Sequence, residues 1–124
     1  MAGEHGMLKV LYVEDEALLA ISMEAALERA GWVVRLAHDG EQGLAQAAAF
    51  VPDVIVTDHM MPRMDGPTML RHLAHRDLKA PAVLTTARSR SDITADDMSL
   101  IAVFLAKPFS EEDLIEAVSK CLAL

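Results

Sequence analysis

The sequence is poor in cysteine, in basic residues and in long apolar runs. Its one cysteine, Cys121, excludes an internal disulfide framework and a cysteine-rich metal site. Eleven Lys and Arg residues stand against 19 Asp and Glu, and this net charge of −8 argues against direct nucleic-acid binding, which needs cations to neutralise phosphates. No apolar run is long enough to span a membrane, and residues 1–7 lack the charged and apolar regions of a signal peptide. We therefore expect a cytoplasmic protein without membrane association.

The length and composition predict one globular domain. The chain has 124 residues, of which 52% are hydrophobic and 24% charged, so wholesale disorder is excluded. Such a chain can bury a core without disulfides or structural metals. We interpret residues 1–7 as an N-terminal extension and residues 8–124 as the folded domain. Without a linker or an internal repeat, no output domain is expected within the chain.

Five short apolar runs predict β-strands. Four are rich in Val, Ile and Leu with almost no polar alternation, which is typical of strands that are covered on both faces. The second contains Arg35, which favours an edge strand. The runs are Leu8–Val13, Val33–Ala37, Val54–Thr57, Ala82–Thr85 and Ala102–Leu105.

Segments with helical spacing lie between and after these runs. Asp65 and Ser110 are suited to cap two of them. The fourth is polar and short. The predicted helices are Ala17–Ala30, Gly40–Phe50, Asp65–Arg76, Ser91–Leu100 and a last one from Ser110 onward. Five alternating strand–helix units predict an α/β fold, a single doubly wound (βα)5 domain with a five-stranded parallel sheet and helices on both faces.

Polar residues follow the apolar runs directly. Glu14 and Asp15 follow the first run, and Asp58 follows the third. Thr86 and Lys107 lie just after the fourth and fifth. Because the carboxyl ends of parallel strands meet at one edge, where open α/β sheets bind ligands, we expect these side chains to converge.

This set of residues predicts phosphoryl transfer to or from a carboxylate. Three carboxylates in one cleft repel one another unless a cation lies between them, and oxygen ligands favour Mg²⁺ or Mn²⁺. Lys107 can contact an anionic group or pair with Asp58. A threonine hydroxyl can donate to a phosphoryl oxygen, although by strand alternation only one of Thr85 and Thr86 can face the site.

The motifs at these strand ends resemble those of response-regulator receiver domains, the phosphoacceptor domains of two-component signalling. The resemblance spans nearly the whole chain, and it implies the strand order 2-1-3-4-5. The motifs, in chain order, are Val13-Glu14-Asp15-Glu16, Val56-Thr57-Asp58-His59-Met60-Met61-Pro62-Arg63-Met64-Asp65-Gly66, Thr86-Ala87 and Lys107-Pro108-Phe109.

The resemblance implies a role for each residue of the site. Asp58 is the position that accepts a phosphoryl group from a histidine kinase or a histidine phosphotransfer protein. Glu14, Asp15 and Asp58, with the backbone carbonyl of Met60, are the implied Mg²⁺ ligands. Lys107 is implied to contact the phosphoryl group.

The resemblance also implies a conformational switch. Thr86 is the switch hydroxyl, and Phe104 takes the place of the switch aromatic residue. The switch would reshape a partner-binding surface made of the fourth helix, fifth strand and fifth helix. Met60 and Arg88 lie where family members tune the lifetime of the phosphoryl group. His59 departs from the pattern, since an apolar residue is common there; strand alternation predicts that it points away from Asp58.

Each of these residues also has an ordinary structural interpretation. Glu14 and Asp15 can cap the first helix, and Lys107 can be a solvated loop residue. Asp58 can be a loop acid, and Phe104 a plain core residue. The four motifs taken together favour the site.

The leading functional hypothesis is a phosphorylation-dependent signalling switch, monomeric or weakly dimeric on phosphorylation. It would catalyse only its own phosphorylation and dephosphorylation, so it is not expected to be an enzyme with a separate substrate. One alternative is a phosphate-independent interaction module with the same fold. Another is a phosphatase of the haloacid-dehalogenase type, although such enzymes carry an Asp-x-Asp nucleophile on the first strand, whereas this chain has Glu14-Asp15.

Overall fold

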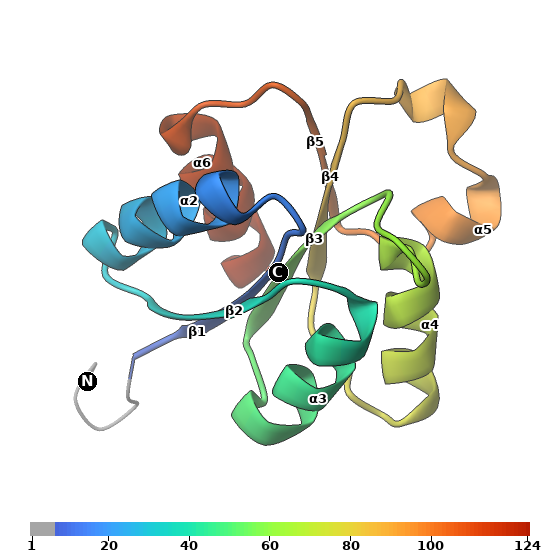
Figure 1. Ribbon diagram of the computed structural model, residues 1–124, viewed down its shortest axis with the longest axis horizontal. Coiled ribbons are helices and arrows are strands. Elements are labelled where there is room, and N and C mark those ends of the chain that lie inside the picture. The colour runs from blue at the N-terminus through green and yellow to red at the C-terminus, as the bar shows by residue number, and fades with distance from the viewer. Residues whose placement is uncertain (1–6) are drawn as a thin grey trace.

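The computed structural model describes residues 7–124, in which strands and helices alternate along the chain (Figure 1). The elements, in chain order, are β1 (Lys9–Val13), α2 (Ala17–Arg29), β2 (Val33–Ala37), α3 (Gly40–Phe50), β3 (Val54–Asp58), α4 (Gly66–His75), β4 (Ala82–Thr86), the 3₁₀ turn η1 (Arg90–Asp92), α5 (Ala95–Met98), β5 (Val103–Ala106) and α6 (Glu111–Leu122). The five predicted strands are confirmed, with ends that differ from the predicted ones by at most one residue.

The strands form one parallel sheet in the order β2-β1-β3-β4-β5, so the predicted fold class and topology are confirmed. The strand β2, which carries Arg35, lies at an edge as expected. Strand β3 is central and pairs with both β1 and β4. The carboxyl ends of β1, β3, β4 and β5 therefore meet at the same edge of the sheet.

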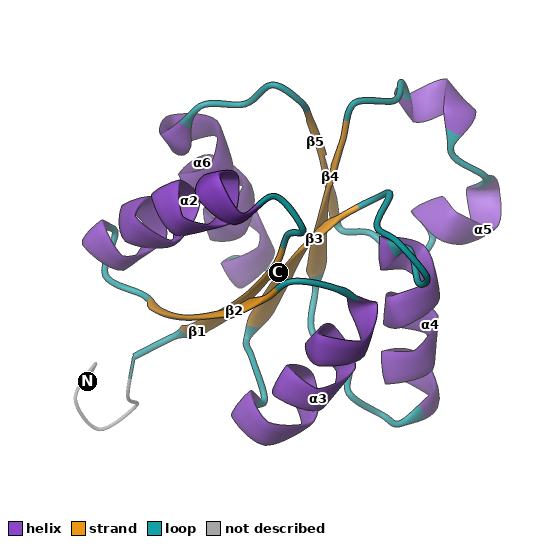
Figure 2. Cartoon of the chain, in the orientation of Figure 1, coloured by secondary structure: helices purple, strands orange, loops and turns teal. Residues whose placement is uncertain are grey.

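Helices cover both faces of the sheet (Figure 2). One face packs against α2 and α6, and the other against α3 and α4. Alternate residues of each central strand point into the two layers, which is why these strands are apolar throughout rather than alternating. Burial on both faces accounts for the continuous Val, Ile and Leu runs of the sequence.

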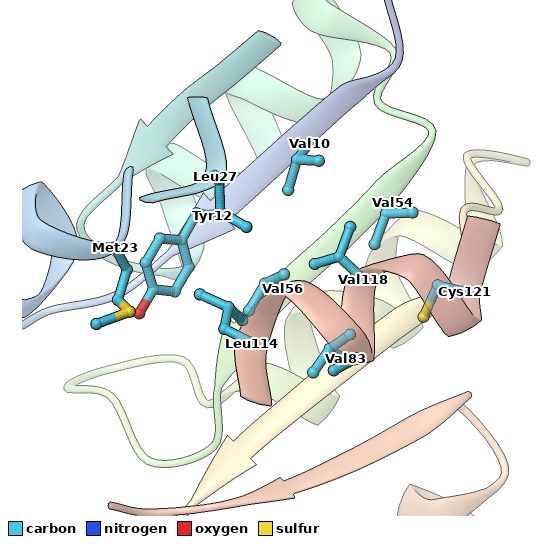
Figure 3. Close-up of a cluster of buried hydrophobic side chains, with 11 residues drawn as sticks. Val10, Tyr12, Met23, Leu27, Val54, Val56, Val83, Leu114, Val118 and Cys121 are labelled. Atoms are coloured by element: carbon cyan, nitrogen blue, oxygen red, sulfur yellow. The ribbon is translucent and has the colours of Figure 1, made fainter. Parts of the chain in front are cut away.

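Buried side chains between the sheet and the helices α2 and α6 form a continuous core (Figure 3). Tyr12 lies in this core with no exposed surface, and its ring points toward Met23 of α2. Leu114 and Val118 of α6 face the central strands from the same layer. Fully burying an aliphatic side chain of this size contributes about 1.5–3 kcal/mol, so the layer anchors the sheet edge that carries the polar residues.

Helix caps occur where the sequence indicates them. Asp65 Oδ1 accepts a hydrogen bond from the Thr68 amide at 2.8 Å, and α4 begins at the next residue, Gly66. Ser110 and Asp113 form a reciprocal capping box at the start of α6, with both hydrogen bonds at 3.0 Å. These contacts satisfy amide groups that the first helical turn leaves without a backbone partner.

The predicted helix Ser91–Leu100 is wrong as a single element. The turn η1 and the four-residue helix α5 occupy its place, separated by Ile93 and Thr94, which are both extended. Asp92 accepts hydrogen bonds from Ser89, and Thr94 Oγ1 accepts the amide of Asp97 at 3.1 Å, so a new cap starts in the middle of the predicted helix. Local side-chain bonds to the backbone compete with a continuous helix, and here they divide it.

Two further expectations concern the ends and the membrane. The predicted N-terminal extension, residues 1–7, lies outside the described residues except for Met7. Within residues 7–124, none of the helices has the length and apolar character that crossing a bilayer requires.

Candidate functional site

Three carboxylates meet where β1 and β3 end. Glu14 and Asp15 follow β1, and Asp58 is the last residue of β3. One oxygen atom from each lies within 4.8 Å of the others. Glu14 is fully buried and Asp58 is 6% exposed, whereas Asp15 is exposed. Because the N-cap of α2 is Glu16, neither predicted acid takes the capping position, and the convergence that the sequence predicted is present.

Lys107 reaches this cluster from the end of β5. Its Nζ lies 3.1 Å from Asp58 Oδ1 and 3.4 Å from Glu14 Oε1. The strand order separates β5 from β3 by β4, so only a long side chain can make these contacts. Lys107 is therefore a part of the acidic site and not a solvated loop residue.

Burial and mutual repulsion raise the pKa values of the two buried acids. Burial, and to a lesser extent the Asp58 carboxylate, raise the pKa of Glu14 to about 7 although the Glu16 amide and Lys107 oppose the rise. Burial and the neighbouring Asp15 likewise raise the pKa of Asp58. Burial alone would lower the pKa of Lys107, but its contacts with Asp58 and Glu14 outweigh burial and raise it. The cluster needs positive charge, and Lys107 supplies only one.

The donor set fits a hard divalent cation. All three clustered side chains offer carboxylate oxygens, which Mg²⁺ and Mn²⁺ prefer, and the exposed Asp15 leaves one side open to water ligands. A bound cation would also relieve the repulsion that raises the pKa of Glu14 and of Asp58. Within residues 7–124 this is the one group of three or more His, Cys, Asp or Glu side chains that is spaced to hold a metal ion.

A pocket adjoins Asp58 on the side of β4. The resemblance implies a role at the phosphoryl group for every lining residue except Ala87. The lining residues are Asp58, Met60, Thr86, Ala87, Arg88 and Lys107. The Met60 side chain is half-exposed. Thr86 and not Thr85 borders the pocket; the Thr85 hydroxyl is buried and has no hydrogen-bond partner within the described chain. Thr86 is therefore the threonine that the site can use.

Sequence reasoning missed the contact that His59 makes. Its backbone amide donates to Asp58 Oδ1 at 3.0 Å, and its ring Nδ1 lies 3.1 Å from Thr86 Oγ1. The ring therefore contacts the threonine, and His59 is not among the residues that line the pocket beside Asp58. No local signal reveals this pair, because the two residues are 27 positions apart and meet only through the register of β3 with β4.

Phe104 lies in β5 with its ring partly buried. The Arg90 guanidinium of η1 lies 5.6 Å from the centre of that ring, a cation–π contact. Phe104 pairs with Leu84, two register positions before Thr86, so the two predicted switch residues occupy neighbouring strands. Phe104 is not a fully buried core residue.

Gly66 lies against the backbone at the end of β3. Its amide donates to the His59 carbonyl at 2.8 Å. A Cβ atom at this position would lie 2.4 Å from the Asp58 carbonyl oxygen, a backbone atom that cannot move aside. The close approach of the two backbones therefore requires glycine.

Comparison with known proteins identifies the family of the chain. The family model "Response regulator receiver domain" matches residues 10–119. The chain is 38% identical over 109 residues to the transcriptional regulatory protein TrcR of Mycobacterium tuberculosis, covering 87% of this chain and 42% of that protein. It is 32% identical over 121 residues to the alkaline phosphatase synthesis transcriptional regulatory protein PhoP of Bacillus subtilis, covering 92% and 48%. The chain thus spans about half the length of these relatives.

Solved structures agree with the sequence matches. The receiver domain of the Francisella response regulator 1452 superposes with a TM-score of 0.85 at 30% identity, covering 94% of this chain and 97% of that one. The chemotaxis protein CheY4 of Vibrio cholerae superposes with a TM-score of 0.88 at 28% identity, covering 94% and 100%. Because the family model matches most of this chain, residues 10–119, the chain belongs to the receiver domains of two-component response regulators.

Proposed function

We propose that this domain is a phosphorylation switch in which Asp58 accepts a phosphoryl group from a phosphohistidine on a histidine kinase or a histidine phosphotransfer protein. The observation that carries the proposal is the surroundings of the Asp58 carboxylate. It ends the central strand, borders an open pocket, lies 3.1 Å from Lys107 Nζ and has two further acids within reach.

Glu14, Asp15 and Asp58, together with the backbone carbonyl of Met60, would hold the Mg²⁺ ion. When bound, the cation supplies charge neutralisation for phosphoryl transfer. Lys107 contributes a second positive charge. In the absence of a phosphoryl group it pairs with Asp58, and we infer that it moves its contact to a phosphoryl oxygen afterwards.

In the transfer step an Asp58 oxygen forms a bond to phosphorus, and the bond between phosphorus and the donor imidazole nitrogen breaks. The electron pair of that bond returns to the imidazole. The positive charge of Lys107 stabilises the charge on the phosphoryl oxygens. In dephosphorylation, which is a separate step, a water oxygen forms a bond to phosphorus, the bond between phosphorus and the Asp58 oxygen breaks, and inorganic phosphate leaves the free Asp58 carboxylate. The domain turns over no substrate other than its own phosphoryl group, so we do not assign it as an enzyme.

The output would follow from Thr86 and Phe104. Donation of the Thr86 hydroxyl to the phosphoryl group would leave space behind β4 into which Phe104 can turn, and the surface formed by α5, β5 and α6 would change for a protein partner. Met60 and Arg88 border the same pocket, so we infer that they set how readily water reaches the phosphoryl group. The negative net charge supports a protein partner and not nucleic acid for this domain. We place it in the cytoplasm, as a monomer or a weak phosphorylation-dependent dimer.

The direct test is intact-protein mass after incubation with acetyl phosphate or phosphoramidate, with and without Mg²⁺. We expect a labile gain of one phosphoryl group that requires Mg²⁺ and is absent in Asp58→Ala. Asp65→Ala is a matched control, because this acid caps α4 and lies in the same loop but outside the cluster. If neither the small donors nor beryllofluoride acts on the wild type, the phosphate-independent interaction module becomes the better interpretation.

A further inference from the structure

A buried hydrogen bond joins the residue after the phosphoacceptor position to the switch threonine. His59 is 7% exposed and Thr86 is 2% exposed, and His59 Nδ1 lies 3.1 Å from Thr86 Oγ1. The two residues stand one position beyond the last register pair of the two strands, Asp58 and Thr85. The His59 amide donates to the Thr85 carbonyl at 2.9 Å, which fixes the backbone behind the pair.

The hydrogen-bond directions follow from what a hydroxyl can do. Thr86 Oγ1 already accepts the Arg88 amide at 3.0 Å. Its own proton needs an acceptor, because an unpaired buried donor is costly, and we infer that His59 Nδ1 is that acceptor, a direction that depends on the histidine tautomer. This arrangement requires a neutral imidazole with its proton on Nε2. The hydroxyl is therefore engaged on the side of His59 and not with the Asp58 carboxylate.

We propose that His59 is a positioning residue that holds Thr86 in its unphosphorylated arrangement and so sets how easily the domain switches. The inference rests on the proposed function, because the Thr86 hydroxyl must leave His59 Nδ1 before it can donate to a phosphoryl oxygen. Breaking this contact is a cost of activation. Removing the His59 acceptor leaves the Thr86 hydroxyl proton without a hydrogen-bond partner in the unphosphorylated arrangement only. The equilibrium between the two arrangements of Thr86 therefore shifts toward the activated one.

The size of the effect follows from the worth of one hydrogen bond. The net contribution of a neutral hydrogen bond corresponds to a factor of about two to ten in an equilibrium constant. Without the acceptor of His59, beryllofluoride, which mimics the phosphoryl group, should bind about two- to tenfold more tightly in the presence of Mg²⁺.

The experiment compares the beryllofluoride affinity of the wild type with that of five variants. His59→Leu removes the acceptor and should bind more tightly than the wild type by that factor. His59→Asn should remain close to the wild type, because the asparagine oxygen can take the place of Nδ1. In a Thr86→Ala background, His59→Leu should have no further effect. His72→Leu, a substitution of an exposed histidine on α4, is the control for loss of a histidine elsewhere.

Three results would overturn the proposal: unchanged or weaker binding by His59→Leu, a His59→Asn variant that behaves like His59→Leu, or an effect that persists in Thr86→Ala. The ¹⁵N NMR chemical shifts of the His59 imidazole in the unphosphorylated wild type test the contact independently. This measurement needs neither phosphoryl chemistry nor a substituted protein. The shifts should show the proton on Nε2, and a proton on Nδ1 would refute the assigned directions. Failure of the wild type to bind beryllofluoride would instead count against the proposed function.

Discussion

The substitution Glu14→Gln should stabilise the domain in the absence of Mg²⁺, although it removes a contact to Lys107. Glu14 is fully buried, and burial with Asp58 nearby raises its pKa from 4.5 to about 7. A raised pKa means that the folded state holds the proton more tightly than the unfolded state. The corresponding stability is complete below about pH 4.5 and is lost as the pH rises through about 7, where the buried carboxylate must ionise.

The magnitude follows from the same values. At about 1.4 kcal/mol for each pH unit, the rise from 4.5 to about 7 corresponds to about 3 kcal/mol lost by the wild type at about pH 8. Glutamine stays neutral and avoids this loss. In the wild type, both Lys107 and the Glu16 amide donate hydrogen bonds to the Glu14 carboxylate. Glutamine has only one side-chain oxygen and can accept only one of these bonds, and the loss of the other costs about 1 kcal/mol. A net gain of about 2 kcal/mol at about pH 8 remains.

The assay is urea unfolding followed by the fluorescence of Trp32, which packs against the core between the sheet and the helices α2 and α6, in buffers that contain EDTA. Relative to wild type, Glu14→Gln should be less stable by about 1 kcal/mol at about pH 4.5, where only the lost hydrogen bond counts, and more stable by about 2 kcal/mol at about pH 8. Glu28→Gln, which removes an exposed acid from α2, should show no such dependence on pH. A destabilised Glu14→Gln at the higher pH, or a difference that does not depend on pH, would refute the reasoning.

Three further predictions concern positions around the site. Gly66→Ala should lower the free energy of unfolding in urea titrations by about 1–3 kcal/mol and slow the phosphorylation of Asp58, because the new Cβ atom meets the Asp58 carbonyl oxygen. Wild-type stability and phosphorylation would contradict the close approach of the two backbones. Arg71→Ala removes the 2.6 Å ion pair to Asp97 and should change the free energy of unfolding by at most about 1 kcal/mol. Hydrogen exchange of the amides in α5 should become faster, and unchanged exchange would mean that the ion pair does not hold α5 in place. Cys121 should resist thiol reagents until the protein unfolds, since it is buried and burial raises its pKa to about 11; fast modification of the native protein would contradict this.

The sequence was sufficient to predict the sheet and the acidic site because both depend on simple rules. Continuous apolar runs mark strands that are buried on two faces, and the carboxyl ends of parallel strands share an edge. The positions of Asp58, Glu14 and Lys107 at strand ends therefore implied their convergence, although they are up to 93 residues apart.

What the sequence could not predict depends on register and on competing local bonds. The contact between His59 and Thr86 exists because β3 and β4 pair with one specific register, which no local pattern encodes. The approach of Gly66 to the Asp58 backbone has the same origin. The division of the predicted helix Ser91–Leu100 reflects competition between helical and capping hydrogen bonds, and Thr94 makes the capping one.

The most direct test of the central claim is to locate the phosphoryl group on the chain. After phosphorylation by phosphoramidate with Mg²⁺, borohydride converts an acyl phosphate to the alcohol of the same residue, and peptide mass spectrometry identifies its position. Modification at Asp58 alone, lost without Mg²⁺, is the result we expect. Modification at Asp15 or Glu14, or at none of the three acids, would contradict the assignment of Asp58 as the phosphoacceptor.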